Sequence, residues 1–89
     1  MNLAAIQTAD AFLASHRRVR WLVSDEHRYS VARIGVQAYD RGWRGDDWAD
    51  EVAIELEQNS SFSPLVIWIA VNFLLPLLLK WLIENWTTA

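Results

Sequence analysis

Residues that could do chemistry are few in this chain and stand far apart. The two histidines, His16 and His27, are not spaced as two metal ligands on neighbouring helical turns would be. The chain has no cysteine, which excludes thiolate nucleophiles, thiolate metal sites and disulfides. No serine stands in a recognisable nucleophile–base arrangement with either histidine. We therefore expect a protein that is not an enzyme, with no catalytic residues, no metal and no cofactor.

A short string of carboxylates is the next candidate. Asp46, Asp47 and Asp50 lie close together, and paired carboxylates on one helical face can hold Mg²⁺ against a diphosphate. Such a site needs a second acidic face opposite the first, and no second motif of this kind follows. Acidic residues also stabilise the first turn of a helix, because the helix dipole is positive there. We therefore expect Asp46 or Asp47 to cap the start of a helix.

One basic cluster stands out near the N-terminus, formed by Arg17, Arg18 and Arg20 with Trp21. Arginines beside an aromatic residue attract the phosphate groups of lipids or nucleic acids. The whole chain has a formal net charge of −3, so no wider basic field surrounds the cluster. Basic residues also complement the negative end of a helix dipole. We prefer to interpret the cluster as a solvated helix end. Contact with lipid headgroups or a protein partner is the second interpretation, and nucleic acid is the least favoured partner.

A second set of residues recurs at intervals of four near the C-terminus: Trp68, Asn72, Pro76 and Lys80. Successive members drift by about 40° on a helix, so Asn72, Pro76 and Lys80 share one face. Pro76 cannot donate to the carbonyl of Asn72, which bends the helix, and an asparagine in lipid is costly without a partner. We expect this face to contact another helix in the membrane, and we assign Leu78 to lipid. The alternative is a tolerated kink with Lys80 snorkelling to the interface.

These residues belong to the longest apolar run in the chain. From Phe62 to Ile83 the only charged residue is Lys80. At about 1.5 Å per residue the run extends about 33 Å, which matches a hydrocarbon core about 30 Å thick. A chain this short could not easily bury a helix that is apolar all round. The sequence therefore predicts a transmembrane helix over 62–84.

The segment before this run has the pattern of a small helical head. Apolar residues at helical spacing predict a first helix over 3–23, a second over 26–41 and a third that ends at about residue 58. Ser24 offers a cap for the second helix. The glycines of the 42–45 segment predict the clearest turn in the chain.

The fold class we expect is all-α: a small N-terminal head of about three helices followed by one C-terminal transmembrane helix. The predicted organisation is a head domain over 1–58, a polar link over 59–61, the transmembrane helix over 62–84 and a short tail over 85–89.

We expect a single-pass membrane protein with the head in the cytoplasm. The N-terminal segment does not resemble a secretory signal, because its basic residues follow the apolar stretch. A short tail after the span then favours a tail anchor, with Trp81 and Trp86 as interfacial anchors. The positive-inside rule mildly favours the opposite orientation, because Lys80 is the basic residue nearest the span ends.

A head this small buries proportionately little surface and leans on a neighbour. We expect a non-enzymatic structural or accessory subunit of a membrane assembly, such as a virion membrane protein of a phage or a small subunit of a membrane complex. Its partners would be the lipid bilayer and other subunits or copies of itself. The alternative is a membrane-permeabilising protein, a phage holin or small toxin, that oligomerises through Asn72, Pro76 and Lys80.

Overall fold

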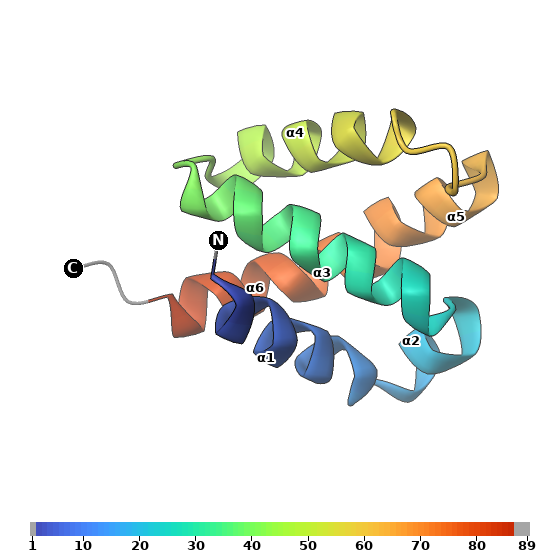
Figure 1. The fold of residues 1–89 in the computed structure, drawn as a ribbon, viewed down its shortest axis with the longest axis horizontal. Coiled ribbons are helices and arrows are strands. Elements are labelled where there is room, and N and C mark those ends of the chain that lie inside the picture. Colours follow the sequence, from blue (N-terminus) through green and yellow to red (C-terminus); the bar gives the residue numbers. More distant parts are fainter. Residues whose placement is uncertain (1, 87–89) are drawn as a thin grey trace.

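The computed structural model of the 89-residue chain describes residues 2–86, and within them every regular element is a helix (Figure 1). In chain order the α-helices are α1 (Leu3–Ala14), α2 (Arg17–Leu22), α3 (Asp25–Asp40), α4 (Gly45–Glu57), α5 (Pro64–Ile69) and α6 (Leu75–Asn85). A π-helical segment, Ala70–Leu74, joins α5 to α6. One continuous helix, here called the C-terminal helix, therefore runs from Pro64 to Asn85. The predicted all-α class is confirmed. Of the predicted tail, residues 87–89 lie outside the described residues.

The first predicted helix, over 3–23, is two helices, so the head has four helices where about three were predicted. The break falls at Ser15 and His16. The Ser15 hydroxyl donates to the carbonyl of Phe12 at 2.6 Å, and His16 Nδ1 lies 3.0 Å from the same oxygen. Side chains that bond to nearby carbonyls in this way compete with the helical backbone. Because His16 is extended, α2 leaves in a new direction.

Two predicted boundary signals are confirmed. The hydroxyl of Ser24 accepts a hydrogen bond from the backbone N–H of His27 at 3.2 Å and caps α3. At the other end of α3, Gly42 adopts a φ of 104°, which a glycine tolerates without strain. The chain then turns into α4, as the glycines predicted.

The predicted cap of α4 is wrong. The helix begins at Gly45 with Arg44 in the cap position, and Asp46 and Asp47 lie in its first turn. The Arg44 guanidinium lies 3.7 Å from the centre of the Tyr39 ring and donates to the carbonyl of Tyr39, and the cap lies two residues before Asp46. The two aspartates still complement the positive end of the helix dipole.

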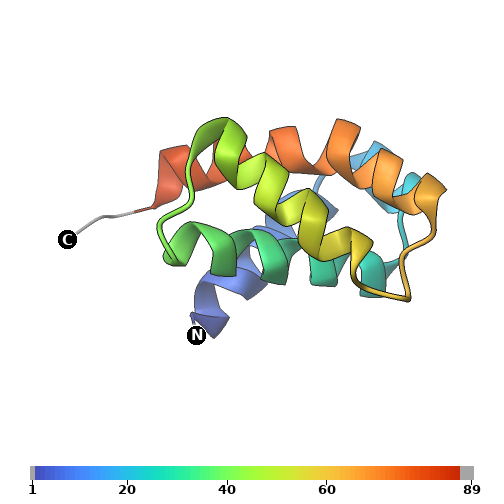
Figure 2. The ribbon, with the colours of Figure 1, turned by 90° about the horizontal axis from the view of Figure 1, so that it is seen from above.

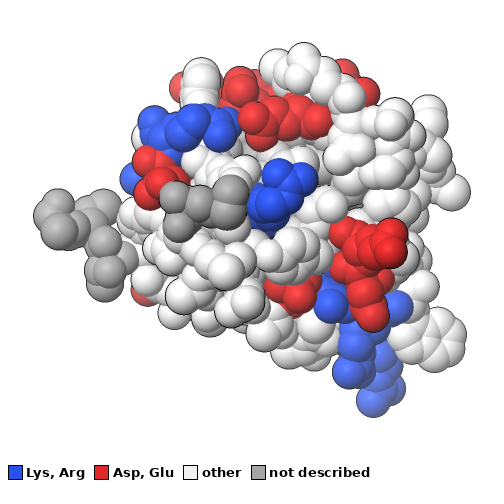
Figure 3. Space-filling view, in the orientation of Figure 1, with Lys and Arg blue, Asp and Glu red and all other residues white. Residues whose placement is uncertain are grey.

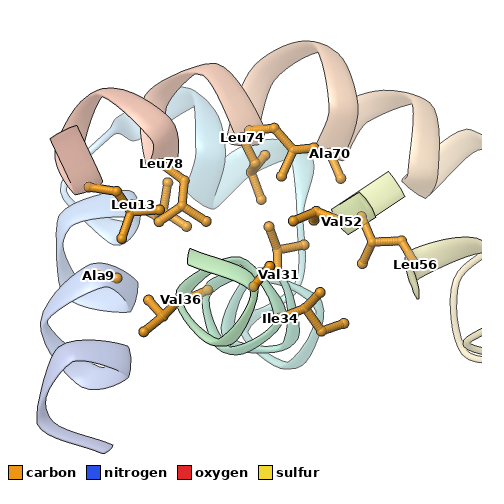
Figure 4. Packing of buried hydrophobic residues seen from close by; sticks show 14 of the residues in the cluster. Ala9, Leu13, Val31, Ile34, Val36, Val52, Leu56, Ala70, Leu74 and Leu78 are labelled. Atoms are coloured by element: carbon orange, nitrogen blue, oxygen red, sulfur yellow. The ribbon is translucent and has the colours of Figure 1, made fainter. Parts of the chain in front are cut away.

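The helices pack around α3, which contacts α1, α4 and α6 (Figures 1 and 2). Helix α6 also packs against α1. The radius of gyration is 11.8 Å, close to the value of about 12 Å for a compact domain of this length. Figure 4 shows Leu74 and Leu78 pointing from the C-terminal helix into the same core as Leu13 and Val31. The predicted head and the predicted span therefore share one hydrophobic core.

The closest approach in this core is made at Gly35 of α3. The indole N–H of Trp48 donates to the Gly35 carbonyl at 2.8 Å. A β-carbon at position 35 would lie only 2.3 Å from Leu78 Cδ2 and 3.1 Å from the Trp48 ring. The absence of a side chain thus lets the C-terminal helix and α4 approach α3. Leu78 is 0% exposed, so its assignment to lipid is wrong for this arrangement.

The expected disturbance at Pro76 takes the form of the π-helical segment just before it. Proline has no N–H to offer the carbonyl one turn earlier, and a wider turn lets other donors replace it. At the end of this segment the N–H of Leu75 bonds to the carbonyl of Ala70. The C-terminal helix changes direction between α5 and α6 (Figure 1).

Candidate functional site

The C-terminal helix carries large apolar side chains on two opposite faces, and the core uses only one of these faces. Its inner face is buried against the head through Ala70, Leu74, Leu75, Leu78 and Leu82. Its outer face, as the term is used below, exposes Leu65, Trp68, Asn72, Phe73, Pro76, Lys80 and Ile83. Leu65 is 67% exposed and Ile83 is 64% exposed, although both are large apolar side chains. Such a surface is usually covered by a membrane or a partner.

Among the described residues, the C-terminal helix is the one helix long and apolar enough to cross a membrane, by length and composition only. Of its most apolar stretch, 28% is buried inside the molecule. Core helices of soluble proteins can be equally long and apolar, although they are mostly buried. However, α1 and α3 pack beside α6, so lipid could not surround the helix while it stays in this arrangement.

The predicted stripe lies on the outer face, where Trp68, Asn72, Pro76 and Lys80 are all exposed. The side-chain amide of Asn72 donates to the carbonyl of Trp68 at 2.8 Å, so one of its donors is satisfied within its own helix. The Trp68 ring meets Phe73 edge to face, with 5.8 Å between ring centres. The stripe is thus available for contact with another helix, which stays a prediction.

The predicted interfacial anchors are half-buried against the head. The Trp81 ring lies 6.5 Å from the Phe12 ring of α1. The Trp86 ring meets Tyr39 of α3 edge to face at 5.2 Å. In this arrangement the two tryptophans pack the end of the C-terminal helix against α1 and α3. To act as anchors at the membrane interface, they would have to leave these contacts.

The basic cluster forms the short helix α2. Arg17, Arg18 and Arg20 are exposed, and none of them makes an ion pair with another of residues 2–86. Trp21 is 85% exposed. In Figure 3 basic side chains project at the lower right, over α2, with acidic side chains beside them near the start of α3. Three arginines and one tryptophan of α2 are thus exposed to solvent, and the arginines have no ion-pair partner within residues 2–86.

The fold brings this basic cluster next to the predicted stripe. A groove of about 420 Å³ runs between α2 and the C-terminal helix, and we call it the α2 groove. Arg17 and Arg18 line it together with Asn72 and Pro76. A smaller hollow beside it also includes Trp21. The remaining lining residues are His16, Val19, Leu22, Phe73 and Leu77, of which the sequence did not indicate Leu22, Phe73 and Leu77.

A larger cleft of about 590 Å³ lies on the other side of the outer face, between the end of α4 and α5. Its lining shares Trp68 and Asn72 with the stripe and is otherwise mostly apolar. Glu57 is the one charged residue in the lining, and no arginine or lysine faces the cleft. The cleft therefore offers nothing to an anion and is distinct from the α2 groove.

Two other titratable residues, His27 and Arg28, take structural positions. His27 Nε2 lies 2.8 Å from the carbonyl oxygen of Ser61 and so ties α3 to the segment before α5. Arg28 donates to Asp10 at 2.8 Å and joins α1 to α3, and this hydrogen bond is the main reason that the pKa of Arg28 is raised. Within residues 2–86, no group of three histidine or carboxylate side chains is placed to hold a metal ion.

No protein-family model, curated protein or solved structure matches this chain.

Proposed function

We propose that this chain is a small, non-enzymatic membrane protein that serves as a structural or accessory subunit of a membrane assembly. The observation that carries the proposal is the outer face of the C-terminal helix. This helix has 22 residues, enough to cross a bilayer, and it exposes large apolar side chains along a face that the core does not use. A tail-anchored protein with a cytoplasmic head would use this helix as its span.

Crossing the bilayer requires the C-terminal helix to leave the bundle. For the inner face of the helix this exchange is nearly neutral, because lipid tails are as apolar as the core that Leu74 and Leu78 would leave. For the head it is unfavourable, because Leu13 and Val31 would face water at a cost of about 1.5–3 kcal/mol for each side chain. The core side chains of an anchored head therefore have to be buried against another surface, and another subunit of the assembly would provide that surface.

In this proposal the compact bundle is the form that precedes insertion. The head shields the inner face of the helix until a membrane is reached. Within the membrane the stripe of Trp68, Asn72, Pro76 and Lys80 then packs against a helix of a second copy or of another subunit.

A membrane-permeabilising protein is the second candidate, and one observation favours it. Asn72, Pro76 and Lys80 are exposed together on the outer face, opposite the apolar inner face. A helix with this division could line an oligomeric lesion with its polar stripe.

Induced expression of the full chain in bacteria tests the proposal against this alternative. An accessory subunit leaves growth and membrane potential unchanged, and it crosslinks to another helix from a photoreactive residue at position 72. Growth arrest with rapid loss of membrane potential, abolished by Lys80→Leu, would instead establish the permeabilising function.

A further inference from the structure

We propose that the α2 groove binds the phosphate headgroup of an acidic phospholipid and so docks the compact bundle on a bilayer surface. The proposal rests on the proposed function in one respect, namely that the chain acts at a membrane. It adds the lipid class, the residues that recognise it and the orientation of the bound molecule.

Charge complementarity is the first argument. Arg17 and Arg18 line the groove, Arg20 lies on the same short helix, and none has a carboxylate partner within residues 2–86. A guanidinium offers several donors in a planar fork that matches phosphate oxygens. Two such groups at one rim therefore suit a single phosphate.

The apolar lining is the second argument. Val19, Leu22, Phe73 and Leu77 lie in the groove beside the arginines, which suits the glycerol and upper acyl carbons that follow a lipid phosphate. Trp21 stands next to them and is 85% exposed. Tryptophan is enriched at the level of lipid headgroups, where its ring is partly buried and its N–H remains wet.

The position of α2 decides the orientation. The groove meets the C-terminal helix at Asn72, Phe73 and Pro76, near the middle of the helix. If the docked helix crossed the bilayer, the arginines would lie near the centre of the hydrocarbon, where a charge is very costly. They reach headgroups only if the helix lies along the surface, with its outer face against the lipid. The bundle therefore docks flat, and insertion separates α2 from the helix.

The surrounding charge favours a lipid over a nucleic acid. Asp25 and Glu26 begin α3 immediately after α2, and the whole chain has a formal net charge of −3. An extended polyanion would meet these carboxylates. A single headgroup bound between Arg17 and Arg18 need not contact these carboxylates.

The test uses the full chain, made by cell-free translation with lipid vesicles and separated by flotation. Vesicles of phosphatidylcholine alone are compared with vesicles that also contain phosphatidylglycerol. The wild-type chain should float at lower lipid concentration with the acidic vesicles, and high salt should remove this preference. Arg17→Gln with Arg18→Gln should raise the required concentration of acidic vesicles about 30-fold. Circular dichroism checks that the variant remains helical.

The control is Arg33→Gln with Arg41→Gln, which removes the same charge from α3 and from the residue that follows it, away from the groove, and also removes the ion pair of Arg41 with Glu55. Its flotation should change much less than that of the α2 variant. Equal effects of the two double variants would overturn the groove as the binding site. Equal flotation of the wild-type chain with both kinds of vesicle would overturn the acidic preference but leave the membrane proposal standing. Failure to float with either kind of vesicle contradicts both the groove proposal and the membrane proposal. Binding of a labelled oligonucleotide is measured in parallel. If the α2 variant loses oligonucleotide binding but floats like the wild type, the groove is a nucleic-acid site.

Discussion

Gly35 shows how a single residue controls the packing of the C-terminal helix. A β-carbon there would lie 2.3 Å from a methyl group of Leu78, which is itself fully buried. Gly35→Leu should therefore lower the free energy of unfolding by about 1–3 kcal/mol, the usual cost of overpacking. Urea unfolding followed by circular dichroism measures the change. Ala11→Leu is the control, because it adds the same side chain to an exposed position of α1. Equal stability of the two variants would mean that the helix does not pack on Gly35.

Arg28 joins α1 to α3 through Asp10 and also bonds to Asp25 in its own helix. The carboxylate of Asp10 is 19% exposed and that of Asp25 is 90% exposed. Asp10→Asn should lower the free energy of unfolding by about 1 kcal/mol. The substitution replaces a charged acceptor by a neutral one in a hydrogen bond that links α1 to α3 and is largely shielded from water. Asp25→Asn should have a smaller effect, since water screens that pair.

The pH dependence of this link has a definite sign. Because the pKa of Arg28 is raised on folding, mainly by the hydrogen bond to Asp10, its contribution to stability is complete below the unfolded-state pKa. It is lost only as the pH rises through the folded-state pKa, above the neutral range. The difference between Asp10→Asn and wild type should therefore be the same at pH 7 and pH 9. A difference that disappears between these values would contradict the assignment.

At the scale of elements, the outer face of the C-terminal helix is the surface that we propose contacts a partner helix. Asn72→Leu should weaken helix association in the membrane by about 1 kcal/mol, within the range for such bonds. Val71→Leu is a matched control, because it places a leucine about 100° further round the helix. An energy-transfer dimerisation assay compares the two. If both substitutions have the same effect, the stripe is a tolerated kink and not a contact surface.

Local signals predicted the elements well where one side chain or turn defines the boundary. Ser24 caps α3, Gly42 permits the turn before α4, and Pro64 begins the C-terminal helix. Each of these residues acts on its immediate neighbours in the chain. The break at Ser15 and His16 was missed because both residues also occur inside helices, and only their bonds to the Phe12 carbonyl stop α1.

Relations between elements were much less predictable. The stripe of Asn72, Pro76 and Lys80 marks one face of the C-terminal helix, but the contact of Leu78 with Gly35 joins residues far apart in the chain, and no local pattern indicates it. The α2 groove depends on the change of direction at His16, which places Arg17 and Arg18 beside Phe73. The sequence indicated the basic cluster and the stripe separately, and only the fold joins them.

At the scale of the whole molecule, the orientation of the head is a separate prediction. The turn between α3 and α4 is exposed, and the chain has no cysteine of its own. With the head in the cytoplasm, a cysteine at Trp43 should resist a membrane-impermeant thiol reagent in intact cells. A cysteine at Thr88, outside the described residues, should react. Ready labelling at position 43 with protection at position 88 would reverse the orientation.

Membrane attachment through the C-terminal helix is the central claim, and sedimentation of cell membranes without detergent tests it most directly. The full-length chain should pellet with the membranes and resist a high-salt wash, because the apolar helix holds it there. A chain without residues 62–89 should no longer pellet with membranes; it should remain soluble or aggregate through the exposed core of α1 and α3. A full-length chain that remains in the supernatant as a compact monomer would contradict the claim, since the C-terminal helix would then be the core helix of a soluble bundle.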